Sequence, residues 1–440
     1  MAHRRVHLGI DYGTSASKII IRDYGAPGGE HATVLTDEGS YRFSSAVSVS
    51  GDMIRLQAPA RTNDQKLRVL QSLKMRVAAE VKGNVERYCY APIEELPAGL
   101  SATDLATLTV ARLVDRGARA AKTVAGADIS LGMTLGVPMS FFTDRTLRKA
   151  FLRISRTAWR LWRSGSLSTD TVSVAEARQF LSEAYAFVDS TPIEDDEIRD
   201  WIRSEAEAAM WWAFQSPSVP AGPYAKVDIG AGTTNSSVFR IVDQYAHGRL
   251  IKERLAFFGA YSGPIGMDAV DEGLAKWKGV PLENRVELRG SEDDLLQDPA
   301  AELACAEAIR GIRRAFSTAW MRGFEKYRNS MHETERWRED AQVFVIGGGS
   351  LTRAVRAGLR EHPQSPSKRL SVKEMESPPD LEFPGTQSVP KEALPFLTVA
   401  YGLSNLGLAI PEVRTPDEVD PLPSAENRRI QIDHEDIYTR

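Results

Sequence analysis

Two short glycine-containing turns carry the residue types that can grip phosphate. Each turn follows an apolar, strand-like run that ends at an aspartate, Asp11 in the first and Asp228 in the second, and each leads into another such run. Glycine lets backbone N–H groups approach phosphate oxygens unobstructed, and small hydroxyl residues add further donors. The candidate phosphate donors are Gly13, Thr14, Ser15, Gly230, Gly232, Thr233 and Thr234.

A third glycine cluster, Gly-Gly-Gly-Ser at 347–350, follows another apolar run. Three such turns predict one nucleotide site shared by two similar lobes. Hydrolysis of a nucleoside triphosphate needs hydrated Mg²⁺, donors for the β- and γ-phosphates and a group that orients the attacking water. Asp11 and Asp228 would hold the metal through its water molecules. An ordinary strand-end Asx turn is the plain alternative for each aspartate.

The order of these motifs resembles the ATPase family that unites actin, the Hsp70 chaperones and the sugar kinases, from residue 8 to about residue 408. The likeness is closest to the Hsp70 nucleotide-binding domain. The resemblance implies an α/β fold with two ribonuclease H-like lobes around a nucleotide cleft, with ATP or ADP and Mg²⁺ as ligands. It makes the first two turns phosphate loops and the third an adenosine-side loop.

Two lysines are candidates for neutralising the γ-phosphate. Lys18 occupies the position of actin's phosphate-contacting lysine in the first loop, where Hsp70 has none. Lys74 lies in Ser-Leu-Lys-Met-Arg-Val, which resembles the context of the Hsp70 catalytic lysine. Either ammonium can serve, and the sequence does not choose between them. A solvated surface lysine is the plain alternative for both.

Glu205 precedes Ala-Glu-Ala-Ala, which resembles the Glu-Pro-Thr-Ala-Ala segment of Hsp70 without its proline. The resemblance gives Glu205 a role in ordering metal and water, and Glu207 competes for that assignment. Asn235 stands where Hsp70 has an aspartate three residues after the last glycine of its second phosphate loop. An amide cannot act as a base, so we expect slow or regulated hydrolysis. The catalytic candidates are thus Asp11, Lys74, Glu205, Asp228 and Thr233.

The segment Ile-Arg-Arg-Ala-Phe-Ser at 312–317 resembles the helix by which Hsp70 holds the adenine base. Arginine planes can stack on adenine, and a serine hydroxyl can bind its edge. A solvated helix face is the plain alternative. The family's spacing from serine to arginine in the adenosine-side loop is one residue shorter than here. The adenosine-side candidates are Gly266, Asp268, Arg313, Arg314, Ser317, Gly348, Gly349, Ser350 and Arg353.

Strand-like and helical runs alternate along the chain. Strands are expected at 6–10, 18–22, 45–49, 131–137, 224–229, 235–241, 250–257 and 341–346. Helices are expected at 101–125, 144–163, 192–215, 267–278, 299–327 and 394–409. A group of strands followed by helices occurs twice along the chain, which predicts two mixed α/β lobes.

We expect lobe I at 1–222 and lobe II at 223–410, with residues 394–409 as a helix between them. Residues 30–82 and 266–332 are expected as inserted subdomains that roof the cleft, the latter on the adenine side. Residues 411–440 alternate prolines and charges without periodicity, which predicts a flexible tail and leaves no room for the substrate-binding domain of a typical Hsp70.

The expected helix at 192–215 has a favourable start, because Thr191 can cap it, Pro192 suits its first position and Glu194 completes a capping box. Its apolar stripe includes Glu205. A lone carboxylate on a core-facing line is costly unless it has a function.

Residues 145–191 form a segment rich in tryptophan and arginine that the Hsp70 resemblance does not cover. Helix 144–163 carries seven basic residues and no acid after Asp144, so it can dock an acidic partner, nucleic acid or lipid headgroups. A solvated helix with aromatic core contacts is the plain alternative. Tryptophan is favoured in interface cores, so we expect a protein partner at 145–215 or at the tail.

Composition excludes several classes of function. A net charge of −4 indicates neither a nucleic-acid nor a membrane partner, and no run is apolar enough for a membrane span. Two cysteines without metal-type spacing fit a reducing compartment, so we expect a cytoplasmic protein. Zinc and Walker-type patterns are absent.

The resemblance leaves four functions to weigh. The leading expectation is a slow Mg²⁺-dependent ATPase that acts as a nucleotide-driven switch on a partner protein. Lys18 encourages an actin-like filament former, and residues 9–15 also suit a small-molecule kinase of the sugar kinase branch. Asn235 is the argument for a protein that binds ATP without turnover.

Overall fold

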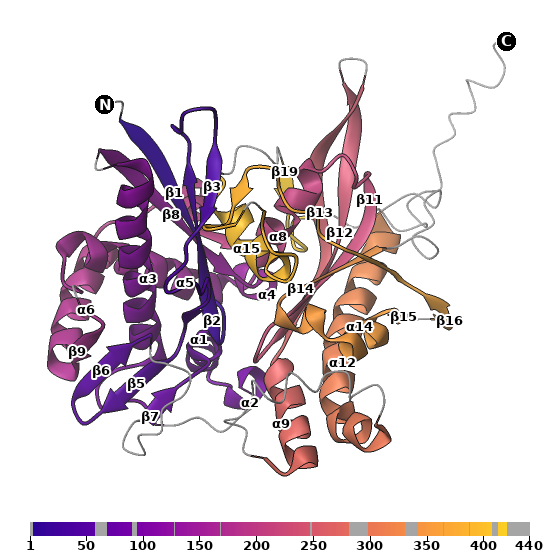
Figure 1. Ribbon diagram of the computed structural model, residues 1–440, viewed down its shortest axis with the longest axis horizontal. Coiled ribbons are helices and arrows are strands. Elements are labelled where there is room, and N and C mark those ends of the chain that lie inside the picture. Colours follow the sequence, from indigo (N-terminus) through magenta and orange to yellow (C-terminus); the bar gives the residue numbers. More distant parts are fainter. Residues whose placement is uncertain are drawn as a thin grey trace, which may run out of the picture.

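Two β-sheets stand side by side in the computed structural model, and helices α8 (Glu205–Gln215) and α15 (Leu394–Leu403) lie between them (Figure 1). Helices and mixed sheets alternate along the chain, which confirms the predicted α/β class. The structure describes residues 3–57, 68–89, 95–126, 128–167, 169–246, 249–280, 298–330, 342–363, 365–386, 388–406 and 412–419.

The first sheet is built around the hairpin that carries the first glycine turn. Its strand order is β10-β8-β1-β2-β3-β18, and the short β4 also pairs with β2. Strand β1 runs antiparallel to β2, with Asp11 opposite Lys18, and parallel to β8. The bounds are β1 (Arg4–Asp11), β2 (Ala16–Asp23), β3 (His31–Val34), β4 (Phe43–Ser44), β8 (Ile129–Val137), β10 (Ile202–Ser204) and β18 (Leu381–Glu382).

The second sheet is built around the hairpin with the second glycine turn. Its strand order is β17-β14-β11-β12-β13-β19. Strand β11 runs antiparallel to β12, with Asp228 opposite Asn235, and parallel to β14. The bounds are β11 (Gly222–Ile229), β12 (Thr234–Ala246), β13 (Arg249–Gly263), β14 (Gln342–Ile346), β17 (Ser371–Lys373) and β19 (Glu412–Arg414).

The two sheets repeat one strand arrangement. In each sheet the two strands of the hairpin are followed by a third antiparallel strand, which is β3 in the first sheet and β13 in the second. On the other side of the hairpin two parallel strands follow, β8 and β10 in the first sheet and β14 and β17 in the second. Even the outermost strands correspond, since β18 lies parallel to β3 as β19 lies parallel to β13. The glycine turn therefore occupies the same place in both sheets.

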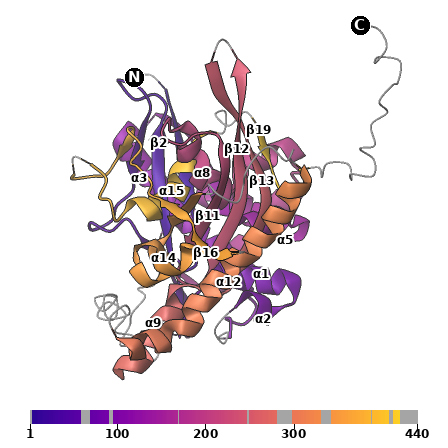
Figure 2. The same ribbon diagram turned by 90° about the vertical axis from the view of Figure 1, so that its right-hand side faces the viewer.

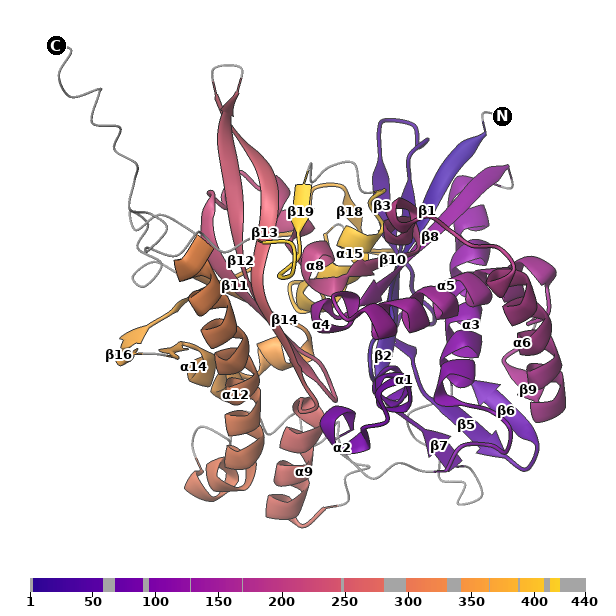
Figure 3. The same cartoon turned by 180° about the vertical axis from the view of Figure 1, so that it is seen from behind.

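Long helices cover the first sheet. Helix α3 (Ala102–Ala125) packs on β1 and β2, and α5 (Arg145–Ser164) packs on α3 (Figure 3). The side chain of Ser101 and that of Asp104 form a reciprocal capping box at the start of α3. Asp144 caps α5 by accepting from two backbone N–H groups.

Helix α12 (Pro299–Ser330) crosses the outer face of the second sheet diagonally, and α9 (Met267–Lys278) packs against α12 (Figure 2). Val227 and Val238 on that face share a core with Phe316 and Trp320 of α12. The third glycine cluster forms a short 3₁₀ turn, η3 (Gly348–Leu351), directly after β14. Helix α14 (Arg353–Leu359) and the hairpin of β15 (Glu361–His362) and β16 (Ser365–Arg369) follow it.

Helix α15 fits tightly between the sheets because glycines remove side chains at its contacts. A methyl group on Gly402 would lie 1.9 Å from the carbonyl oxygen of Ala208 in α8. One on Gly9 of β1 would lie 2.2 Å from the carbonyl oxygen of Ala400 in α15. These approaches hold α8, α15 and the first hairpin in one packed unit.

The expected insertion at 30–82 is wrong as a single unit. Residues 31–34 form β3 of the first sheet, because they pair with β2. Strands β5 (Val47–Ser50), β6 (Met53–Leu56) and β7 (Arg68–Leu70) form a small sheet, which β9 (Thr171–Ser173) joins from the arginine-rich segment. Helices α1 (Leu73–Lys82) and α2 (Val85–Tyr88) follow β7.

The expected helix at 192–215 is confirmed only at 198–201 and 205–215, and it is wrong as one continuous helix. A 3₁₀ turn η1 (Asp195–Glu197), a short α7 (Ile198–Trp201) and strand β10 precede α8, which begins at Glu205. Residues 202–204 pair with β8 and so leave the helical path. Thr191 caps no helix, since its hydroxyl donates to the carbonyl of Phe187.

The predicted tail and inter-sheet helix have different bounds. Residues 412–419 are not a tail, because β19 pairs with β13 and the side chains of Thr415 and Val419 are buried. Helix α15 ends at Leu403, and residues 407–409 and 420–440 lie outside the described residues.

The basic side chains of α5 are largely engaged within the molecule. Arg153 lies 3.9 Å from the ring centre of Tyr185, and Arg160 lies 4.2 Å from that of Phe187, both on α6 (Val174–Asp189). Trp159 packs against Trp201. These contacts favour the plain alternative of a helix with aromatic contacts. No described helix has the length and apolar character that a bilayer crossing requires.

Candidate functional site

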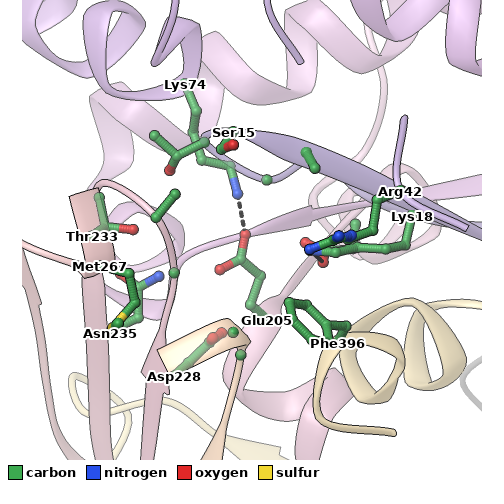
Figure 4. A pocket seen from close by; sticks show the side chains of 18 residues that line it. Ser15, Lys18, Arg42, Lys74, Glu205, Asp228, Thr233, Asn235, Met267 and Phe396 are labelled. Carbon is green, nitrogen blue, oxygen red and sulfur yellow. Dashed lines mark hydrogen bonds and ion pairs between the residues drawn. The ribbon is translucent and has the colours of Figure 1, made fainter. Parts of the chain in front are cut away.

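The first two glycine turns and the third cluster meet at one pocket of about 130 Å³ (Figure 4). The turns face each other, because a methyl group on Gly232 would lie 3.0 Å from Cγ2 of Thr14. The predicted residues that line the pocket are Asp11, Gly13, Thr14, Ser15, Lys18, Lys74, Glu205, Asp228, Gly230, Thr233 and Gly348.

Each of the two aspartates is paired with a lysine. The Nζ atom of Lys18 lies 3.0 Å from Oδ2 of Asp11, its neighbour across the first hairpin. Lys226 Nζ lies 3.3 Å from Oδ2 of Asp228, and Lys226 is only 1% exposed. Lys226 was not among the residues predicted from the sequence, although its spacing of two along a strand puts it on the same face as Asp228.

Lys74 and Glu205 form a buried ion pair at the centre of the pocket (Figure 4). Lys74 lies in the first turn of α1, and Glu205 opens α8, whose N-terminus is capped by the Ser204 side chain. Burial raises the pKa of the Glu205 carboxyl group, and the charges of Asp11 and Asp228 add to that rise while Lys74 opposes it. Glu205 is therefore the group in the pocket best suited to hold or release a proton.

Glu207 does not compete with Glu205 for the pocket. Its carboxylate accepts from Arg199, with Nη1 and Oε2 3.1 Å apart, and it is not part of the pocket lining. The strand-to-helix junction at β10 and α8 separates the two: Glu205 follows the strand directly, whereas Glu207 lies two residues into the helix.

Asn235 lines the pocket from β12, opposite Asp228. Among the described atoms its Oδ1 is buried without a hydrogen-bond partner. Behind it lies a chamber of about 10 Å³, the size of one water molecule, lined also by Glu205, Lys226 and Ser237. The amide can orient a water molecule there but cannot take its proton.

Most adenosine-side candidates do not line the pocket. Arg313 pairs with Glu361 at 2.5 Å, and Arg314 and Arg353 are exposed. The ones outside the lining are Gly266, Asp268, Arg313, Arg314, Ser317, Gly349, Ser350 and Arg353.

Several of these residues hold the loops together instead. The backbone N–H of Asp268 donates to the carbonyl of Ala231, which ties α9 to the second turn. The hydroxyl of Ser350 donates to the carbonyl of Gly347 at 2.7 Å. Thr234, predicted as a phosphate donor, instead gives its hydroxyl hydrogen to the carbonyl of Ile265.

The pocket also contains residues that were not predicted from the sequence, namely Ala16, Arg42, Ala231, Met267 and Phe396. Arg42 comes from the loop before β4 and Phe396 from the first turn of α15. No motif surrounds either residue, so only the tertiary contact reveals them.

A larger groove of about 440 Å³ lies beside the amino-terminal half of β8, between Arg5, Trp159, Asp200 and Trp201. It contains no glycine turn and no paired aspartates. His7 in its wall is buried, which lowers the pKa of the imidazole to about 3, with Arg203 contributing. We therefore assign the functional site to the smaller pocket, because it has the glycine turns and the two aspartates that the larger groove lacks.

The described residues contain no group of three or more histidine, cysteine, aspartate or glutamate side chains arranged to hold a metal ion. Comparison with known proteins gave no match to any family model or curated protein.

Proposed function

We propose that the chain binds ATP with Mg²⁺ between two ribonuclease H-like lobes and hydrolyses it slowly, as a conformational switch of the actin and Hsp70 kind. The observation that carries the proposal is that the two glycine turns, which follow Asp11 and Asp228 on separate sheets, meet with Gly232 against Thr14. The repeated strand order of the two sheets supports a two-lobed fold of that kind.

The donor set fits a hydrated magnesium ion. Asp11 and Asp228 place two carboxylates in one pocket, and Mg²⁺ usually keeps several waters while it uses one or two carboxylates and the phosphates. The bound ion would screen the negative charge of the β- and γ-phosphates. The backbone N–H groups of Thr14 and Thr233 are the candidates to bind phosphate oxygens. Those of Gly13 and Gly230 already donate to the carbonyls of Asp11 and Thr233.

Glu205 is the proton acceptor in this proposal. The water oxygen forms a bond to the γ-phosphorus, the bond from that phosphorus to the β-γ bridging oxygen breaks, and one water proton passes to an Oε atom of Glu205. ADP and inorganic phosphate leave. Lys74 holds the carboxylate in place and offsets charge on the γ-phosphate, and Asn235 orients the water.

The test is to replace the metal-facing carboxylates. Asp11→Asn and Asp228→Asn should each lower Mg²⁺-dependent phosphate release by about 100-fold, because charge stabilisation at the phosphates depends on the held ion. Asp52→Asn, in an exposed turn outside the pocket, is the matched control and should keep full turnover. If Asp228→Asn keeps both the turnover and the circular dichroism spectrum of the wild type, the proposed catalytic site is refuted.

Binding without turnover is the second candidate function. Asn235 favours it, because it puts an amide where the resembled family has a carboxylate. Isothermal titration with ATP, run beside phosphate release, separates the two. Tight binding with no phosphate release over hours would replace the proposed hydrolysis by a nucleotide sensor.

A further inference from the structure

We infer that Arg42 is a phosphate-binding residue of this pocket and the main source of its preference for a polyphosphate chain. The inference rests on the proposed nucleotide site and adds a residue that the family resemblance did not supply. It begins from the charges that line the pocket (Figure 4).

The other cations at the pocket are already matched by carboxylates. Lys18 pairs with Asp11, Lys74 pairs with Glu205, and Lys226 behind the pocket pairs with Asp228. Within the described part of the chain, the guanidinium of Arg42 pairs with no carboxylate. Arg42 is thus the uncompensated positive charge of the site, and an anion is its natural complement.

Aromatic rings position this charge without neutralising it. The guanidinium carbon of Arg42 lies 5.4 Å from the ring centre of Phe396 and 6.0 Å from that of Tyr41. The ammonium of Lys18 lies 5.9 Å from the same Phe396 ring. An aromatic face attracts a cation but leaves its N–H donors available, so both cations stay directed at the pocket.

The Phe396 ring also joins Arg42 to the third glycine cluster. A methyl group on Gly348 would lie 2.9 Å from Cε1 of Phe396, so the backbone there packs directly against the ring. A phosphate held by Arg42 would therefore lie beside the carboxyl end of β14 as well as beside the first hairpin. The planar guanidinium offers two parallel N–H donors, which suit two oxygens of one phosphate better than an ammonium does.

The test is titration calorimetry with Mg²⁺·ATP and with inorganic tripolyphosphate. Arg42→Ala should weaken both ligands by about 10- to 100-fold, the range expected for losing a charged hydrogen bond. Arg42→Lys should recover only part of the loss. Arg55→Ala, an exposed arginine on β6 outside the pocket, is the matched control and should bind both ligands as the wild type does.

Each result decides the inference. Unchanged affinity of Arg42→Ala for both ligands would overturn it, and so would a loss for ATP alone, since that places Arg42 on the nucleoside. If Arg42→Ala fails to fold, Arg42→Gln, which keeps the length and polarity of the stem, gives the same comparison. A wild-type protein that binds neither ligand would instead refute the proposed function.

Discussion

At the scale of single residues, the buried pair of Lys74 and Glu205 sets the chemistry of the pocket. Both side chains are about 4% exposed, and two further carboxylates lie near Glu205. Protonation of Glu205 becomes easier in this surrounding, because burial disfavours its charge. An ionised Glu205 is nevertheless needed to accept a proton from water.

We therefore predict that turnover depends on pH through the ionisation of the Glu205 carboxyl group. Because its pKa is raised, turnover should fall with falling pH at values above those of an ordinary glutamate, and Glu205→Gln should abolish turnover across the range. Phosphate release measured from pH 5 to pH 8 gives the profile. Glu207→Gln is the matched control, since Glu207 pairs with Arg199 outside the pocket. A Glu205→Gln variant that keeps the wild-type pH dependence would contradict the assignment.

His7 gives a second residue-scale prediction, for stability. The folded protein holds its pKa near 3 while the unfolded chain protonates near 6.5. The unfolded state thus binds more protons below pH 6.5, and stability should fall with falling pH by up to about 1.4 kcal/mol per pH unit. His7→Gln should lose less stability in chemical denaturation between pH 6.5 and 4.5. Equal losses in both proteins would show that His7 does not carry the effect.

The sequence predicted pocket residues in the glycine turns and at Lys74 and Glu205, whereas most of the adenosine-side candidates lie outside the pocket lining. Asp11, Thr14, Asp228 and Thr233 could be selected because glycine spacing and strand ends are local signals. Arg42 and Phe396 reach the site through tertiary contacts, for which a single sequence contains no local mark.

At the scale of elements, the hairpins were predictable and the segment before α8 was not. Alternating apolar runs around a glycine turn define a hairpin by themselves. Strand β10 has three residues and exists because it pairs with β8, which lies far earlier in the chain. A capping motif at 191–194 therefore predicted one long helix where tertiary pairing produces a strand.

The contact of α15 with α8 gives a prediction about packing. Gly402→Ala should lower the free energy of unfolding by about 3 kcal/mol, because the new methyl group meets the Ala208 carbonyl and the helices must separate. Thermal and urea denaturation measure the change. Gly358→Ala in α14, where the nearest atom is at 3.7 Å, is the matched control and should be neutral or slightly stabilising. Equal stability of the Gly402→Ala variant and the wild type would argue against this tight packing.

At the scale of the whole molecule, two sheets with one strand order meet at a shared pocket. The repeated motif in the sequence indicated two similar halves, since each carries the same turn chemistry. Their contacts could not be predicted, because they depend on which faces meet. One such contact is the hydrogen bond between the hydroxyls of Ser140 in α4 (Met139–Phe142) and Ser262 in β13, with oxygens 2.6 Å apart.

That contact tests whether the two halves must part for nucleotide exchange. In a Ser140→Cys/Ser262→Cys variant the two sulfur atoms would lie close enough to form a disulfide on oxidation. If release of nucleotide requires the halves to separate here, the oxidised variant should release labelled ADP at least about 10-fold more slowly, and reductant should restore the rate. The single-cysteine variants, oxidised in the same way, control for modification alone. Complete cross-linking, shown by mass spectrometry, together with an unchanged release rate would mean that exchange proceeds without opening at this contact. The proposed switch would then have to operate through the loops around Gly232 and Gly348.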